Sequence, residues 1–270
     1  MKRIYLDMKE CSMEPGSITV AGDTFHYISR VLRMKEGDLF SGFDGTGREY
    51  EIEVSLMGKK SMTGRVISSR VTAERELPFS LAVYQSVPRG NKMDFIIGEM
   101  SQLGVSTVIP VESVRVSVSV PDGRYRAKTE RWKRIAAAAS SVSGRQMVTG
   151  IGQPVRFVKA LEHEADLSII FWEGSKVMLR DALRGADVRR NMSVRIFIGP
   201  EGGFSCEEVE MASARNVIPA SLGPRILKVE TAAVLGAAFT VYELENMLSG
   251  NPASDEGAGE REEDACHNDD

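Results

Sequence analysis

The stretch 194–198 is Val-Arg-Ile-Phe-Ile and leads directly into Gly-Pro-Glu-Gly-Gly at 199–203. A short, nearly continuous apolar run is typical of a strand buried on both faces, as in a parallel sheet covered by helices. Three glycines in five positions allow the backbone to approach a ligand without hindrance from a Cβ atom. Because ligands in open α/β sheets bind beyond the carboxyl ends of the strands, 199–203 is a candidate binding loop. A tight turn that simply requires glycine is the alternative explanation.

The region 76–248 alternates between strand-like and helix-like stretches, which predicts an α/β unit with a parallel sheet covered on both faces. Ser205 and Glu208 have the spacing of a capping box at the start of a helix. Five apolar residues follow the i, i+3, i+4, i+7 spacing of an amphipathic helix that Gly104 ends: Met93, Ile96, Ile97, Met100 and Leu103. The predicted strands are 80–87, 105–111, 167–171, 194–198 and 219–222, and the predicted helices are 93–103, 131–140, 177–183, 205–216 and 230–248.

The first 75 residues have a different, β-rich pattern. Polar and apolar residues alternate over 48–54, and Asp44-Gly45 before them is typical of a tight hairpin turn. Further strands are predicted at 3–6, 17–20, 39–43 and 61–67. Many short strands with glycine turns indicate a small barrel. One helix is predicted over 24–33, with four apolar residues on one face: Phe25, Ile28, Val31 and Leu32. The charged stretch 70–76 and Pro78 mark the boundary between the two domains.

Charge is unevenly distributed along the 270 residues, whose formal net charge is −4. Eight acidic residues and one arginine lie in 249–270, so residues 1–248 carry a net charge of about +3, which permits but does not prove RNA binding. The tail has almost no apolar residues, and we expect it to be disordered and its deletion to leave the melting temperature unchanged. Neither a signal peptide nor a membrane span is recognisable, so we expect a soluble, cytoplasmic protein. Three distant cysteines predict no metal site: Cys11, Cys206 and Cys266.

A second informative stretch covers residues 221–233, where a Gly-Pro turn is followed by charges and an alanine-rich helix. Arg225, Lys228 and Glu230 stand among apolar neighbours, where a charge is costly unless it is paired or functional. An ion pair that caps the helix is the alternative to a functional role. The chain has neither the GxGxxG fingerprint of dinucleotide-binding proteins nor a GxxxxGK[ST] P-loop.

Together, GPEGGFSxxE at 199–208 and LGPRILKVETAA at 222–233 resemble the two hallmark segments of the SPOUT methyltransferases. Within that superfamily the chain is most similar to the 16S ribosomal RNA uridine N3-methyltransferases. Three further stretches match in order, and the resemblance covers roughly residues 1–248. These stretches are 26–33 with Gly37-Asp38, the helix 92–105 that ends in LGV, and the alanine-rich segment 131–145 that ends in SxR.

The resemblance implies a PUA-like β-barrel over 1–75 and a SPOUT domain with a trefoil knot over 76–248. It also implies S-adenosylmethionine as cofactor, 16S ribosomal RNA or the small ribosomal subunit as substrate, a homodimer, and no membrane or metal partner. Backbone groups of three knot loops would hold the cofactor. Subunits would pack closely through Ala232, Ala233, Ala237 and Ala238, although ordinary core packing explains these alanines equally well. The implied cofactor-binding residues are Phe171, Glu173, Gly199, Pro200, Glu201, Gly202, Gly203, Leu222, Gly223, Ile226 and Leu227.

Chemistry at uridine N3 requires removal of a proton that is mostly retained at neutral pH. A fixed guanidinium stabilises the resulting anion, and Arg225 is the candidate for this role. Glu230 and Glu201 are candidates for the general base, or for partners that orient Arg225 or a backbone amide. The substrate base must be exposed or flipped to reach the pocket. The candidate RNA-binding residues are Arg3, His26, Arg30, Arg33 and Arg145.

Several positions depart from the family pattern, and they affect the substrate more than the fold. Ser141-Val142 replace a usual Glu-Gln pair, and Glu99 and Gln102 stand where Lys and Glu are typical. Lys228 and Val229 stand where Arg and Thr are common. Two alternatives therefore stay open: a SPOUT enzyme that methylates another RNA site, and a catalytically inactive ribosome-binding paralogue. A phosphate-binding α/β enzyme is least favoured, because no basic P-loop residue follows the glycine-rich loop.

Overall fold

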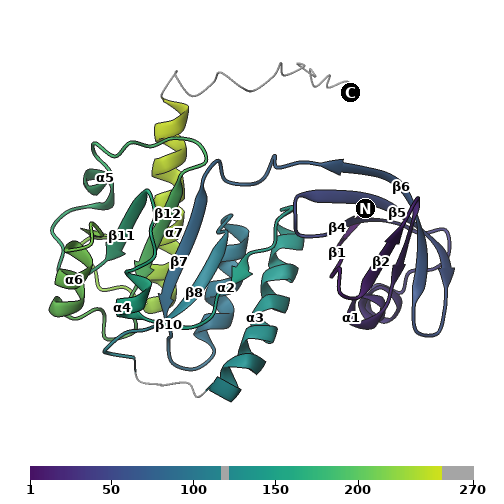
Figure 1. The fold of residues 1–270 in the computed structure, drawn as a ribbon, viewed down its shortest axis with the longest axis horizontal. Helices are drawn as coiled ribbons and strands as arrows, with labels where there is room; N and C mark the ends of the chain where they lie inside the picture. The colour runs from purple at the N-terminus through teal and green to yellow at the C-terminus, as the bar shows by residue number, and fades with distance from the viewer. Residues whose placement is uncertain (117–121, 251–270) are drawn as a thin grey trace, which may run out of the picture.

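The computed structural model describes residues 1–116 and 122–250, so the expected acidic tail lies outside the described residues from position 251 onward. The described chain forms two sheets that lie at opposite ends of the molecule, with the end of α3 (Asp122–Val142) against β1 between them (Figure 1). No helix in this part of the chain has both the length and the apolar character needed to cross a bilayer.

The N-terminal sheet has six strands in the order β1-β4-β5-β6-β3-β2, all antiparallel except the β1–β4 pair. The predicted hairpin is present, because β4 and β5 pair up to Phe43 and Glu49 around the turn. Within that turn the Asp44 carboxylate accepts hydrogen bonds from the Thr46 amide and hydroxyl. The strands are β1 (Lys2–Tyr5), β2 (Cys11–Glu14), β3 (Ser17–Val20), β4 (Leu39–Phe43), β5 (Arg48–Met57) and β6 (Met62–Val71).

The helix predicted over 24–33 begins and ends two residues earlier and changes type. It consists of α1 (Gly22–His26) and a π-helical turn, η1 (Tyr27–Val31), in which the Leu32 amide donates to the Tyr27 carbonyl. Phe25 and Ile28 are buried as predicted, whereas Val31 is 65% exposed. A π-turn contains more residues than an α-turn. The extra residue rotates Val31 away from the face that contacts the sheet, so its predicted burial was wrong.

The second sheet is parallel throughout, as predicted, with the strand order β10-β8-β7-β12-β11-β13 and β9 beside β8. The short strands β9 and β10 were not predicted. The strands are β7 (Ser80–Ser86), β8 (Thr107–Glu112), β9 (Gly150–Ile151), β10 (Val155–Arg156), β11 (Leu167–Phe171), β12 (Ser193–Ile198) and β13 (Ile218–Ala220).

Helices cover both faces of this sheet, which is why its central strands are apolar on both sides. Side chains of α2 (Lys92–Gln102), α3 and α7 (Val229–Ser249) pack on one face with Ile196 and Ile198. Side chains of α4 (Phe157–Ala160) and α6 (Cys206–Ser213) pack on the other with Phe197. A further short helix, α5 (Leu179–Ala182), precedes β12.

The alanine-rich helix α7 packs against α2 and β12. Ala233 and Ala237 are completely buried in this core, so ordinary core packing accounts for these two alanines. Ala232 and Ala238 are half-buried.

Candidate functional site

Three chain segments meet at the carboxyl edge of the parallel sheet. Phe171 at the end of β11 pairs in register with Ile198 at the end of β12, and on its other side with Ala220 at the end of β13. The segments that follow these strands therefore leave the sheet side by side. They enclose a cavity of ≈ 110 Å³, which we call the three-loop cavity. Its lining consists of Phe171, Trp172, Glu173, Ile198, Gly199, Pro200, Glu201, Gly203, Ser221, Leu222, Gly223, Arg225, Ile226, Leu227, Val229 and Ala232.

The cavity brings together nearly all the residues expected to bind the cofactor. Of the predicted set, Gly202 alone does not line it. Its carbonyl faces outward and accepts a hydrogen bond of 2.7 Å from Arg115 Nη1. Trp172, Ile198 and Ser221 were not predicted, although each adjoins a predicted residue in the sequence.

The glycine-rich loop 199–203 has a conformation that other residues would not adopt. The Gly203 amide donates to the Pro200 carbonyl at 2.9 Å, and Gly203 has a φ of +64°. A Cβ atom on Gly199 would lie 3.3 Å from Gly203. The loop is thus a tight turn that requires glycine, as the alternative explanation held. It also lines the three-loop cavity, and its role in ligand binding stays a prediction.

Contacts on one side of this loop come from the helix that follows it. Ser205 and Glu208 form the predicted capping box of α6. Glu208 Oε1 also accepts a hydrogen bond of 2.8 Å from the amide of Val114, just after β8. The loop is therefore fixed to both the next helix and the segment after β8.

On the other side, Lys92 connects the two candidate carboxylates. Its Nζ lies 2.9 Å from Glu201 Oε1 and 3.4 Å from Glu230 Oε2, and the Arg89 amide also donates to Glu201 Oε1. Of the two partners considered for these carboxylates, Arg225 pairs with neither among the described residues, whereas Glu201 does accept from a backbone amide, that of Arg89. Lys92 begins the family-like stretch 92–105, just before the predicted helix 93–103, and it was not among the predicted site residues.

This arrangement determines the protonation of both carboxylates. Burial alone would raise the pKa of Glu201, but hydrogen bonds from Lys92 and from backbone amides outweigh it and lower the pKa. A bond from its own backbone amide, together with Lys92, lowers the pKa of Glu230. The bond to Glu201 in turn raises the pKa of Lys92. Both carboxylates are thus ionised at neutral pH and are weak proton acceptors.

Arg225 is the opposite case. It lines the cavity, its residue is exposed, and no hydrogen bond or ion pair joins it to any residue of 1–116 or 122–250. Its neighbour Ile226 is 92% exposed. A guanidinium without an internal partner is available to an anionic group of a ligand.

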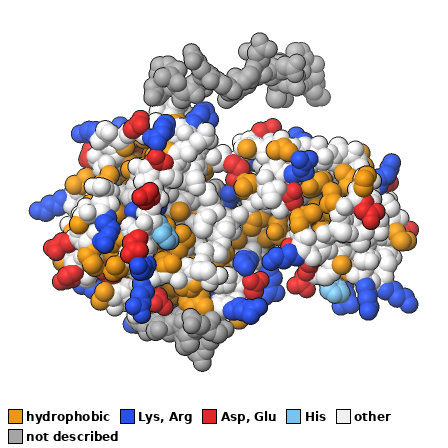
Figure 2. Space-filling model, viewed as in Figure 1, with side chains coloured by type: hydrophobic (Ala, Val, Ile, Leu, Met, Phe, Trp, Pro, Cys, Tyr) orange, Lys and Arg blue, Asp and Glu red, His pale blue; other side chains and the backbone are white. Residues whose placement is uncertain are grey.

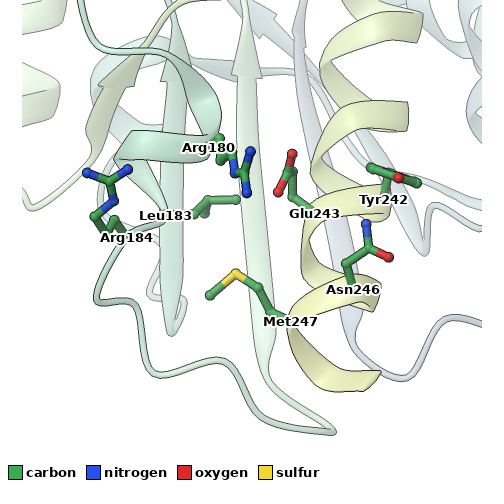
Figure 3. Close-up of a pocket in the computed structure, with 7 residues that line it drawn as sticks. All are labelled: Arg180, Leu183, Arg184, Tyr242, Glu243, Asn246 and Met247. Atoms are coloured by element: carbon green, nitrogen blue, oxygen red, sulfur yellow. The ribbon is translucent and has the colours of Figure 1, made fainter. Parts of the chain in front are cut away.

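A larger hollow of ≈ 460 Å³ lies elsewhere, between α5 and the carboxyl-terminal half of α7 (Figure 3). It contains none of the predicted site residues and no glycine-rich loop. Val229 and Ala232, which line the three-loop cavity, lie at the opposite end of α7. We therefore take the smaller three-loop cavity as the candidate site. The larger hollow is lined by Arg180, Leu183, Arg184, Tyr242, Glu243, Asn246 and Met247.

Comparison with known proteins gives the family. The sequence profile described as "RNA methyltransferase domain" matches residues 75–240, and that of the "RNA methyltransferase PUA domain" matches residues 20–67. The chain belongs to this RNA methyltransferase family.

Relatives of the chain carry one common name. The Bacillus subtilis ribosomal RNA small subunit methyltransferase E is 29% identical over 251 residues, which cover 91% of this chain and 98% of the relative. The Aquifex aeolicus protein of the same name is 30% identical over 217 residues, 79% of this chain and 88% of the relative.

Solved structures agree with the sequence matches. A methyltransferase from Legionella pneumophila in complex with its cofactor S-adenosylmethionine has a TM-score of 0.80 and 28% identity, with 91% of this chain and 97% of that chain covered. The Neisseria gonorrhoeae ribosomal RNA small subunit methyltransferase E, bound to S-adenosylmethionine, has a TM-score of 0.77 and 25% identity, with 89% and 96% covered.

The expected RNA-binding residues divide into two groups. Three of them are exposed: His26 at the end of α1, Arg30 in η1 and Arg33 just after η1. Figure 2 shows Lys and Arg side chains gathered at the end of this half of the molecule where Figure 1 places α1. These three residues are accessible to a polyanion.

Arg3 and Arg145 lie instead inside the junction between the two sheets, which corrects the expectation for them. Arg145 is 2% exposed and donates to Glu76, to Thr149 and to backbone carbonyls. Arg3 pairs with Glu49 at 3.1 Å, stacks over the Phe43 ring and donates to the Arg145 carbonyl. Guanidinium groups engaged in this way hold the two halves together and do not face RNA phosphates.

Proposed function

We propose that this protein is an S-adenosylmethionine-dependent methyltransferase that modifies N3 of a uridine in small-subunit ribosomal RNA. The observation that carries the proposal is the three-loop cavity, which places Arg225 beside the loops expected to hold the cofactor. Family membership and the names of the relatives supply the reaction class and the RNA substrate. We propose a cytoplasmic location on the ground of this substrate.

The residues present fit the cofactor. Gly199, Gly203 and Gly223 expose backbone groups to the cavity, and Gly223 has a φ of +114°, so the loops offer amides and carbonyls without side chains in the way. The cavity is smaller than the roughly 300 Å³ at which small-molecule sites begin. Within the described chain no hydrogen bond holds residues 224–227, so we propose that this wall is the one that moves when a ligand enters.

The chemistry follows from the charges around the cavity. When bound, the cofactor would supply a methyl group on a cationic sulfonium: an electron pair on uridine N3 would form the new bond to that methyl carbon, and S-adenosylhomocysteine would leave with the electrons of the broken sulfur–carbon bond. Arg225 stabilises the negative charge that develops on the base as the N3 proton leaves to solvent water. Glu201 and Glu230 are ionised and held by Lys92, so we assign them an electrostatic and orienting role rather than that of a strong base.

The proposed domains are a PUA-like RNA-binding barrel over 1–75 and a SPOUT domain over 76–248. His26, Arg30 and Arg33 contribute phosphate contacts from the barrel. The path of the chain supports a trefoil knot. It leaves β13 at the edge of the sheet, returns past the loops after β11 and β12, and begins the helix that packs on β12 and α2.

We also propose that the protein is a homodimer, with α7 at the interface. Phe239 and Tyr242 on α7 are 44% and 64% exposed, and Phe95 on α2 is 53% exposed. Exposed aromatic residues on neighbouring helices are typical of an interaction surface. Light scattering behind a sizing column measures the mass directly, and a monomer at all concentrations would contradict this part.

The test of the function is methyl transfer from labelled cofactor to purified small ribosomal subunits, followed by mapping of the modified nucleotide. We expect one modified uridine, methylated at N3. Label at another base or atom would establish a different SPOUT specificity. Calorimetric titration with S-adenosylmethionine identifies the inactive paralogue, because such a protein binds the cofactor poorly or binds it without transfer.

A further inference from the structure

Three segments that are distant in the sequence meet at one ammonium group. Lys92 is the first residue of α2, Glu201 lies in the glycine-rich loop, and Glu230 lies in the first turn of α7. Glu201 lines the three-loop cavity, whereas Lys92 and Glu230 stand behind its wall. Glu201 is therefore the member of this group that reaches a ligand in the cavity directly. We call Lys92, Glu201 and Glu230 the Lys92 cluster.

We propose that Lys92 is a positioning residue of the cofactor site, which holds the glycine-rich loop against the start of α7 and so sets the shape of the three-loop cavity. This inference rests on the proposed function, because it assumes that the cavity binds S-adenosylmethionine. If it holds, cofactor affinity depends on Lys92 although this residue does not line the cavity.

The geometry of Glu230 shows why the cation is needed. Its Oε2 atom is buried and has no hydrogen-bond partner of good geometry, and Lys92 Nζ at 3.4 Å is the cation that faces it. The side chains of Glu201 and Glu230 are 32% and 27% exposed, so water screens their mutual repulsion only in part. Without Lys92, two neighbouring carboxylates would repel each other, and the loop and the helix would move apart.

The direction of the effect separates positioning from simple electrostatics. The Lys92 cluster has a net charge of −1, and S-adenosylmethionine carries a sulfonium cation that S-adenosylhomocysteine lacks. If Lys92 acted only through its charge, its removal would make the site more negative and would tighten binding of the cation. If Lys92 holds the loop, its removal weakens binding of both molecules.

The experiment measures the Kd of the full chain for S-adenosylmethionine and for S-adenosylhomocysteine by calorimetry. We expect Lys92→Met to raise both Kd values about tenfold and Lys92→Arg, which keeps the charge and the donors, to stay within about threefold of wild type. The matched control is Lys133→Met, which removes a lysine that pairs with Glu130 at 2.8 Å on α3, away from the cavity. It should leave both affinities unchanged.

A double-variant cycle guards against a general loss of folding. In the Lys92→Met background, adding Glu201→Gln should cost less affinity than it does in the wild type, because the two side chains act as one unit. Unchanged or tighter cofactor binding by Lys92→Met would overturn the inference. So would weak cofactor binding by Lys92→Arg, or fully additive effects of Lys92→Met and Glu201→Gln. Failure of the wild-type protein to bind S-adenosylmethionine would instead overturn the proposed function.

Discussion

The junction between the two sheets and the three-loop cavity use the same residue type in opposite ways. At the junction, Arg145 is buried and directs its donors to Glu76, to Thr149 and to the carbonyls of Ser101 and Val105. At the cavity, Arg225 is exposed and has no partner among residues 1–116 and 122–250. A guanidinium whose donors all have protein partners stabilises the fold, whereas one whose donors have no such partners is available to a ligand. The difference predicts which variants lose stability and which lose activity.

The largest effect on stability is expected at the junction. Arg145→Met should lower the free energy of unfolding by about 3 kcal/mol, because it leaves the Glu76 carboxylate, 13% exposed, without its cation. Urea titration of the full chain measures this. The control Arg184→Met removes an exposed arginine that pairs with Asp181 on the surface and should cost at most about 0.5 kcal/mol. Similar losses for the two variants would remove the contrast between junction and surface.

The largest effect on activity is expected at the cavity. Arg225→Ala should reduce methyl transfer to less than a tenth of wild type while the melting temperature and the cofactor Kd stay near normal. Among residues 1–116 and 122–250 the guanidinium makes no hydrogen bond or ion pair whose loss would destabilise the fold. Arg215→Ala, at an exposed position after α6, is the control. If Arg225→Ala retains more than about a tenth of the activity, a loss of only ~1.4 kcal/mol in the barrier, the role is misassigned.

A smaller effect is expected from the backbone of the glycine-rich loop. Gly203→Ala places a Cβ at a φ of +64° and against the Glu173 carboxylate, so we expect a loss of about 1 kcal/mol in stability and about tenfold in cofactor affinity. Gly185→Ala is the matched control, because Gly185 has a φ of +87° but no atom within 4 Å of the added Cβ.

Gly185→Ala thus isolates the conformational cost, and its cofactor affinity should equal that of the wild type. If Gly203→Ala and Gly185→Ala lose the same cofactor affinity, the loss comes from the backbone cost of alanine at positive φ. The conformation of the glycine-rich loop would then have no specific effect on the cavity. Calorimetry and thermal melting of both proteins give the comparison.

Features that depend on local pattern could be predicted from the sequence. The apolar run at 194–198, the amphipathic spacing at 93–103 and the capping box at Ser205 each depend on residues a few positions apart. The family resemblance carried by the two motifs also implied which loops would meet, and these loops do follow strands that end at a common edge of the sheet. β2 was missed, since three of its four residues are exposed and show no alternation.

Features that depend on long-range partners could not be predicted. Nothing near Lys92 in the sequence indicates that its ammonium lies between Glu201 and Glu230, which are more than a hundred positions away. Arg3 was expected to contact RNA as a cation of the barrel, and Arg145 as the cation that ends a matching segment. Only the packing of the two sheets shows that they contact each other. For charged side chains, the tertiary partner decides the role.

The smallest effect is expected at the carboxyl terminus. Gly250 ends α7, where its amide donates to the Asn246 carbonyl, so a truncation that removes only 251–270 leaves the described helix intact. The composition of the removed segment, with eight acidic residues and few apolar ones, gives it no means of stabilising the core. We therefore expect the melting temperature to be unchanged within error at physiological salt. A clear drop would mean that the acidic segment docks on the folded chain, and a drop that disappears at high salt would identify the contact as electrostatic.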